Sequence, residues 1–119
     1  MSTLSSSNQR SFFEAQARPE TQTMVALLAD DLQVVDLMHF TSESKEALGR
    51  IETIIARAKD LRSTSIVVCE TSNAWELTSE QKRQLGLLVR ILAESDIDLL
   101  DYCFISKESF KSFRSASLI

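Results

Sequence analysis

Residue types that mark specialised protein classes are scarce in this chain. Its 119 residues include two glycines, one proline, two cysteines and one histidine. Two cysteines exclude a disulfide-rich secreted scaffold and fit a reducing compartment, where thiols stay free. The low proline and glycine content, with 44% hydrophobic and 25% charged residues, excludes collagen-like and low-complexity chains. The composition is typical of a globular domain.

A basic excess and a long apolar segment are also missing. The chain has 13 Lys and Arg against 17 Asp and Glu, whereas a DNA-coating surface is usually basic, so we do not expect direct DNA binding. No apolar run approaches the ~20 residues that cross a bilayer, and we find no signal peptide. We therefore expect a cytoplasmic protein that does not associate with membranes.

The first 22 residues differ in composition from the rest. Polar residues dominate them, and Phe12 and Phe13 are too few to form a core. We expect residues 1–22 to be a disordered or loosely docked tail. Residues 23–119 are expected to form one domain, since a single core commonly serves about 100–150 residues.

Apolar periodicity predicts the elements of this domain. Short apolar runs predict strands buried in a sheet, and apolar residues spaced three or four apart predict amphipathic helices. The expected strands are 24–29, 32–40, 65–69, 99–105 and a short one at 110–113, and the expected helices are about 42–61 and 79–95. Thr78 and Gln81 match a capping box at the start of the second helix. The order ββαβαββ predicts an α/β fold with a single mixed sheet and two main helices.

Several segments of the chain match a known family in order and spacing. They are the strand at 66–68, Thr78-Ser79, Leu99-Leu100-Asp101-Tyr102 and Phe110-Lys111-Ser112-Phe113-Arg114. They resemble the RadC-like branch of the JAB/MPN (JAMM) metallopeptidases. In that family a strand ends in His-x-His-Pro-Ser-Gly, Pro-Ser-x-x-Asp opens a helix, and Leu-Leu-Asp-His precedes Tyr-x-Ser-Phe. The resemblance covers about residues 24–119 and implies a JAB/MPN fold with layering like that of cytidine deaminases.

The metal-binding residues of that family are replaced in this chain. Its two His positions fall on Cys69 and Thr71, and its Asp falls on Lys82. Ser79, a non-ligand beside the active site, is kept, and Glu20 lies near the place of the catalytic Glu. Catalytic Zn²⁺ normally takes three protein ligands, and an ammonium group repels a dication. We therefore expect no metal, no cofactor and no metallopeptidase activity, and we assign no catalytic residue.

Trp75, Glu70 and Glu76 flank the groove that the resemblance implies, and they are the candidate binding residues. Trp75 either covers a sheet edge, fills the vacated pocket, or anchors a partner, because exposed Trp is enriched in binding hot spots. Lys82 is hypothesised to pair with Glu70 or Glu76 as a structural substitute for the metal.

The cysteines and the single histidine have structural interpretations. Cys69 and Cys103 follow apolar residues, and free Cys commonly behaves as a small buried hydrophobe. His39, near the end of a predicted strand, is interpreted as a half-buried side chain with a hydrogen-bond partner rather than as a base or a metal ligand.

The resemblance and the replaced ligands together predict a function. We expect a bacterial-type, catalytically inactive RadC-like JAB domain that binds or scaffolds a protein partner, or pairs with itself as a homodimer. A link to DNA repair is implied by the resemblance alone. The alternative is a divergent metal-dependent isopeptidase or peptidase of the JAMM type, in which Cys69 and groups supplied in trans hold zinc.

Overall fold

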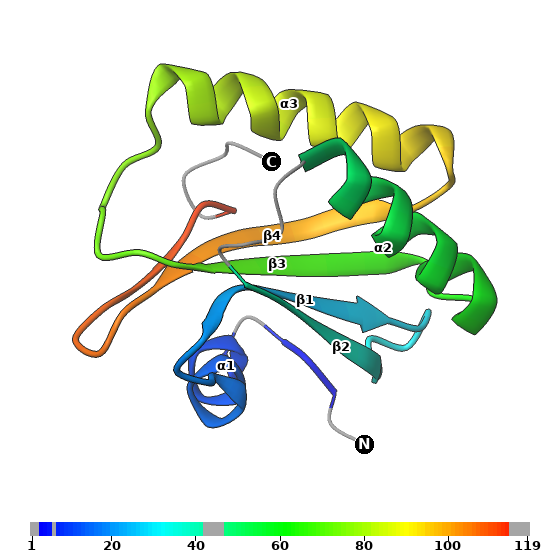
Figure 1. Cartoon of the computed structure of the whole chain (residues 1–119). Coiled ribbons are helices and arrows are strands. Elements are labelled where there is room, and N and C mark those ends of the chain that lie inside the picture. The colour runs from blue at the N-terminus through cyan, green and yellow to red at the C-terminus, as the bar shows by residue number, and fades with distance from the viewer. Residues whose placement is uncertain (1–2, 6, 42–46, 115–119) are drawn as a thin grey trace.

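Five strands form one mixed sheet in the order β2-β1-β3-β4-β5 (Figure 1). The computed structural model describes residues 3–5, 7–41 and 47–114. The elements are α1 (Gln9–Gln16), β1 (Thr21–Leu28), β2 (Val34–Thr41), α2 (Ala47–Leu61), β3 (Ser65–Thr71), α3 (Ser79–Glu94), β4 (Asp98–Ile105) and β5 (Phe110–Ser112). The predicted α/β fold with a single mixed sheet is confirmed.

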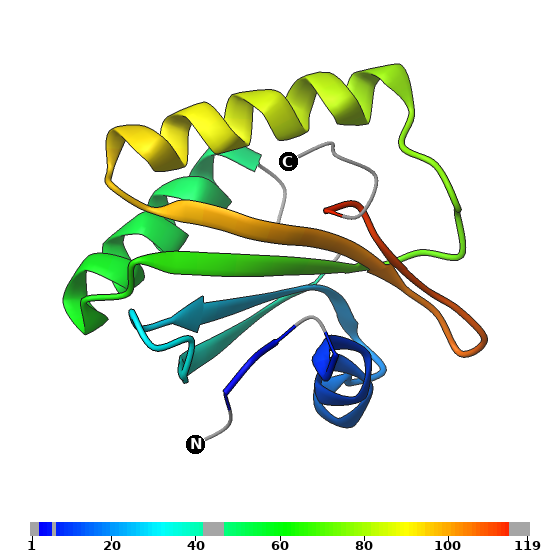
Figure 2. The same ribbon diagram turned by 180° about the vertical axis from the view of Figure 1, so that it is seen from behind.

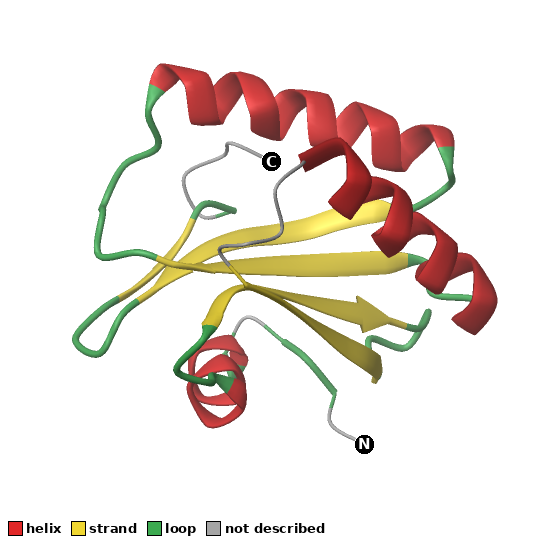
Figure 3. Ribbon diagram, viewed as in Figure 1, coloured by secondary structure: helices red, strands yellow, loops and turns green. Residues whose placement is uncertain are grey.

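The strand pairing is antiparallel except between β3 and β4. β1 pairs antiparallel with β2 and β3, and β5 pairs antiparallel with β4. Parallel strands cannot be joined by a tight turn, and α3 forms the crossover between β3 and β4 (Figure 3). The strands and both main helices occur where periodicity predicts them, except that residues 42–46, the predicted start of the first helix, lie outside the described residues. The finer JAB/MPN assignment stays a prediction.

Helices cover both faces of the sheet. α2 and α3 lie on one face and α1 lies on the other (Figures 1 and 2). Along β1 and β3 the side chains alternate between two cores. Val25 and Val68 belong to the core under α2 and α3, whereas Met24 and Cys69 belong to the core under α1. Coverage on both faces explains why these central strands read as continuous apolar runs.

The N-terminal segment differs from the expected tail. Gln9–Gln16 is a helix, and the side chains of Phe13 and Leu4 are 0% and 3% exposed. Two phenylalanines are too few to make a core of their own, but they complete the apolar face that β1, β3 and β4 supply. Burying one Phe contributes about 1.5–3 kcal/mol. The observed order is therefore αββαβαββ, and β1 begins at Thr21, inside the range assigned to the tail.

Local hydrogen bonds fix the ends of the helices. At the start of α3, Thr78 Oγ1 accepts from the N–H of Gln81 at 3.1 Å, and Gln81 Oε1 accepts from the N–H of Thr78 at 2.8 Å, so the predicted capping box is confirmed. α2 and α3 both end in Schellman motifs, with Arg62 and Asp96 in the left-handed conformation at φ 56° and 58°.

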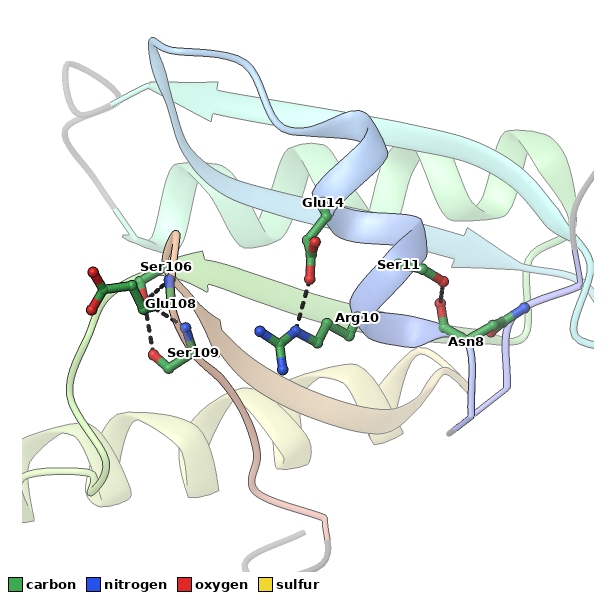
Figure 4. A network of polar contacts seen from close by, with 7 residues as sticks. All are labelled: Asn8, Arg10, Ser11, Glu14, Ser106, Glu108 and Ser109. Atoms are coloured by element: carbon green, nitrogen blue, oxygen red, sulfur yellow. Dashed lines mark hydrogen bonds and ion pairs between the residues drawn. The ribbon is translucent and has the colours of Figure 1, made fainter.

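Surface polar groups hold α1 and the β4–β5 turn in shape (Figure 4). Arg10 and Glu14 form an ion pair at 2.7 Å one turn apart on α1. In the turn, Ser106 Oγ accepts from the N–H groups of Ser109 and Glu108 at 3.1 and 3.4 Å. The Arg10–Glu14 pair is exposed, so it contributes little to the free energy of unfolding, whereas Ser106 and Ser109 in the turn are half-buried.

Candidate functional site

The residues predicted to line one groove do not lie together: one is buried in a core and most of the others are exposed on separate elements. Cys69 is 0% exposed and lies in the core under α1. Thr71, two residues later on β3, is exposed, and its hydroxyl donates to the carbonyl of Thr21 at 3.2 Å. Ser79 and Lys82 are exposed in the first turn of α3. Glu20 is exposed in the turn just before β1, one residue from the Thr21 carbonyl that Thr71 contacts.

Cys69 and Cys103 face each other across the parallel pair β3 and β4. Both thiols are fully buried. The hydrogen bond with Cys69, followed by burial and the Asp101 carboxylate, raises the pKa of the Cys103 thiol far above its usual range. These effects disfavour the thiolate, which is the form of cysteine that acts as a nucleophile or a metal ligand. The prediction that both cysteines are buried is confirmed, and their structural role stays an interpretation.

Asp101 is a buried carboxylate, 1% exposed, that joins three parts of the chain. Its Oδ2 accepts from Gln9 Nε2 at 2.8 Å and from Ser112 Oγ at 2.5 Å. Its Oδ1 accepts from the backbone N–H groups of Tyr102 and Arg114 at 2.7 and 3.0 Å. Four donors compensate for burying this carboxylate. Asp101 therefore links α1, β4 and the end of β5.

The residues at the positions of the family's zinc ligands do not fit a zinc site. The Cys69 thiol is enclosed and hydrogen bonded to Cys103, and the Thr71 hydroxyl donates to a backbone carbonyl. Within residues 3–5, 7–41 and 47–114, no three His, Cys, Asp or Glu side chains converge in a way that could hold a metal ion. Cys69, Thr71 and Lys82 therefore support no metal-dependent step.

Trp75 lies in the loop between β3 and α3. Its side chain is 61% exposed, so it does not fill a vacated pocket, and neighbouring Glu76 is also exposed. The hypothesis that Lys82 pairs with Glu70 or Glu76 is wrong. In the described part of the chain, the ion pairs are Arg10–Glu14, Arg57–Asp36 and Arg83–Glu80. Lys82 extends from the exposed side of α3, whereas Glu70 contacts other partners.

Glu70 lines a pocket between the sheet and the two helices α2 and α3. The pocket has a volume of about 180 Å³. The Tyr102 hydroxyl donates to Glu70 Oε2, and the Thr23 hydroxyl donates to Glu70 Oε1 at 3.4 Å. Burial, and after it the Glu70 charge, raises the pKa of Tyr102 far above its usual range. The phenol therefore stays protonated and acts as a fixed hydrogen-bond donor.

Arg50 on α2 lines the same pocket. Its Nη2 donates to the Thr41 carbonyl at 3.0 Å, its Nη1 approaches Thr23 Oγ1 at 3.5 Å, and its guanidinium lies 5.6 Å from the centre of the Phe40 ring. Its Nε is buried and has no hydrogen-bond partner among the described residues. An unpaired buried donor costs about 1–3 kcal/mol, so Arg50 is the polar group of this pocket that most needs a partner.

Sequence reasoning missed this pocket although it named Glu70. Arg50, Thr23 and Tyr102 come from three separate elements, and no local spacing relates them. The one available signal was an arginine on the otherwise apolar side of the first predicted helix, one residue before Ile51.

His39 agrees with its interpretation: it is half-buried, and its Nδ1 lies 2.9 Å from Thr21 Oγ1. Burial, then Arg18, lowers its pKa.

Comparison with models of known protein families and with curated proteins finds no match to this chain. The resemblance to RadC-like JAB domains therefore stays a prediction that depends on the motifs alone. Among the helices in the described ranges, none is both long enough and apolar enough to span a bilayer.

Proposed function

We propose that this chain is a catalytically inactive RadC-like JAB domain that binds another protein, with a second copy of itself as the partner. The observation that carries the proposal is the 61% exposure of Trp75 in the loop that follows β3. By resemblance, that loop is where the family has its active-site segment. An exposed Trp costs solubility, and Trp is the residue type most enriched in binding hot spots.

The inactive half of the proposal is supported by the surroundings of the replaced ligands. Cys69 is enclosed beside Cys103, and Lys82 brings a positive charge to the start of α3. Neither arrangement suits a dication with an open position for water. The mixed α/β sheet is compatible with the proposed family. A cytoplasmic location is proposed from the composition, and a link to DNA repair from the resemblance alone.

The binding half of the proposal is also supported by an exposed apolar side chain on the helix that follows the Trp75 loop. Leu87 on α3, the helix that this loop enters, is 46% exposed. The third large exposed hydrophobic side chain of the described residues is Leu32, at 37% exposure. It lies in the turn after β1, at the end of the sheet opposite to the β3–α3 loop, because β1 and β3 are antiparallel. Leu32 is therefore a matched control for Trp75.

Sedimentation velocity over a concentration series tests the proposed pairing. We expect a reversible dimer whose Kd rises by about thirtyfold or more in Trp75→Ala, since a hot-spot truncation costs about 2 kcal/mol or more. Leu32→Asn should leave the Kd unchanged. A wild-type chain that stays monomeric throughout, or a Leu32→Asn chain that dissociates as readily as Trp75→Ala, contradicts the proposal.

Zinc calorimetry, combined with peptide and isopeptide cleavage assays, tests the inactive half separately. We expect no stoichiometric zinc binding and no cleavage with added zinc. Stoichiometric binding accompanied by cleavage, both lost in Cys69→Ser, would establish the alternative of a divergent JAMM-type peptidase.

A further inference from the structure

Two opposite charges line the pocket between the sheet, α2 and α3 without pairing with each other. Arg50 and Glu70 form no ion pair with each other, and the pairs found within the described ranges involve other residues. One hydroxyl separates them: Thr23 Oγ1 lies 3.5 Å from Arg50 Nη1 and 3.4 Å from Glu70 Oε1. The pocket thus presents a positive and a negative group that are separated by a single threonine hydroxyl.

The positive group has unused donor capacity. A guanidinium has five N–H donors in a planar fork, which suits a carboxylate. Nη2 is held by the Thr41 carbonyl and Nη1 has only the long contact to Thr23. The buried Nε has no hydrogen-bond partner in the described chain. A ligand carboxylate beside Nη1, whose contact to Thr23 is 3.5 Å long, would give the guanidinium a charge-assisted hydrogen bond.

The negative group is fixed in position by two hydrogen bonds. The Tyr102 hydroxyl and the Thr23 hydroxyl each donate to one oxygen of Glu70. Each carboxylate oxygen can accept a further hydrogen bond, so Glu70 can also receive an ammonium group. A ligand carrying only a carboxylate would meet the charge of Glu70 without compensation. A ligand carrying both charges leaves the pocket neutral.

The rest of the lining is apolar and limits the size of the ligand. Ile51 and Ile54 of α2 and Leu85 and Leu88 of α3 are among the lining residues. A cavity of about 150 Å³ holds benzene, whereas drug-sized ligands occupy about 300–1,000 Å³. The volume of about 180 Å³ therefore suits one small molecule with a short hydrocarbon chain. Gln84, which also lines the pocket, is exposed, so the pocket reaches solvent beside α3.

From this juxtaposition we infer that the pocket binds a free α-amino acid with an aliphatic side chain. Its carboxylate lies against Arg50, its ammonium group lies against Glu70, and its side chain lies between the isoleucines of α2 and the leucines of α3. The inference does not depend on the proposed protein partner, because Trp75 does not line this pocket.

Titration of the full chain with four probes, followed by ¹H–¹⁵N NMR, tests the inference. The probes are leucine, 4-methylpentanoate (no amine), 3-methylbutylamine (no carboxylate) and glycine (no side chain). We expect saturable shifts at pocket amides such as those of Val68 and Leu85 with leucine. The other three probes should bind at least tenfold more weakly, because each lacks one of the three contacts.

Matched variants assign the contacts. Arg50→Met should weaken leucine binding at least tenfold, whereas Arg57→Met, another α2 arginine whose partner is Asp36 outside the pocket, should not change it. Glu70→Gln should weaken leucine binding and leave 4-methylpentanoate binding unchanged or stronger. If Arg50→Met does not fold, as judged by its thermal transition, the comparison of the four probes on the wild-type chain decides whether the ligand needs its carboxylate, its amine and its side chain.

Three results would overturn the inference. One is the absence of saturable shifts with leucine up to about 20 mM, beyond the millimolar affinity of a weak small ligand. Another is equal binding of leucine and 4-methylpentanoate, which would mean that Glu70 does not contact the ligand. The third is an equal loss of leucine binding in Arg57→Met and Arg50→Met.

Discussion

Replacing Phe13 by Ala tests whether α1 belongs to the core of the domain. Phe13 is 0% exposed, packs against the core residues of the sheet face opposite to α2 and α3, and lies edge-to-face with Phe12 at 5.2 Å. Truncating a buried Phe to Ala generally costs about 3–5 kcal/mol. The lost edge-to-face contact is part of this cost, at about 0.5–1.5 kcal/mol.

A loosely docked helix would limit that loss. If α1 adds less than about 3 kcal/mol to the domain, Phe13→Ala simply releases the helix, and the free energy of unfolding falls only by the docking energy. Release also exposes apolar surface in the native state, which lowers the m-value of urea unfolding. The size of the loss and the m-value together therefore distinguish an integral helix from a loosely docked one.

Urea unfolding followed by far-ultraviolet circular dichroism measures both quantities. We expect Phe13→Ala to lose about 3–5 kcal/mol at an unchanged m-value. Phe12→Ala, at a half-buried position on the same helix, should lose less. A loss below about 1 kcal/mol for Phe13→Ala, or a lowered m-value, would refute the assignment of α1 to the core and restore the docked tail expected from composition.

The same unfolding assay checks three further predictions. Asp101→Ala should lower the free energy of unfolding by about 3–5 kcal/mol, because it leaves the donors from Gln9, Ser112 and two backbone groups without their acceptor. A loss under about 1 kcal/mol would show that water replaces the carboxylate. Arg62→Gly should stabilise the chain by about 0.5–1 kcal/mol, because the left-handed conformation strains a side chain more than it strains glycine; destabilisation would contradict this explanation. Burial lowers the pKa of folded His39 below its usual 6.5, so the unfolded state binds the proton first, and the free energy of unfolding should fall as pH drops below 6.5. His39→Gln should flatten that part of the pH profile, and an unchanged slope would show that other groups cause it.

Local chemistry explains which parts of the fold could be predicted. The capping box at Thr78 and Gln81 depends on residues three apart, and the helix stripes depend on a 3.6-residue period. The central strands β1 and β3 are covered on both faces, which makes their sequences continuously apolar. In each case the signal and the structure occupy the same short segment.

The tail and the groove could not be predicted from local segments. Phe13 is buried because β1, β3 and β4 present an apolar face to it, and its neighbours in sequence contain no sign of that face. Cys69 and Glu70 are adjacent in sequence, and the family resemblance puts both in one groove. Side chains alternate along a strand, so the structure puts the thiol under α1 and the carboxylate under α2 and α3.

The amino-acid sequence by itself determined the class of the domain, the position of its main helices and strands, and, with a single histidine, the absence of the His-x-His pair that the proposed family uses for zinc. Only the tertiary structure decided that the N-terminal segment completes the second core and that Arg50, Thr23, Glu70 and Tyr102 line one pocket. The physical reason is that helix and strand patterns depend on neighbours a few residues apart. Which side chains meet across a sheet depends on strand order and register, which the whole chain sets at once.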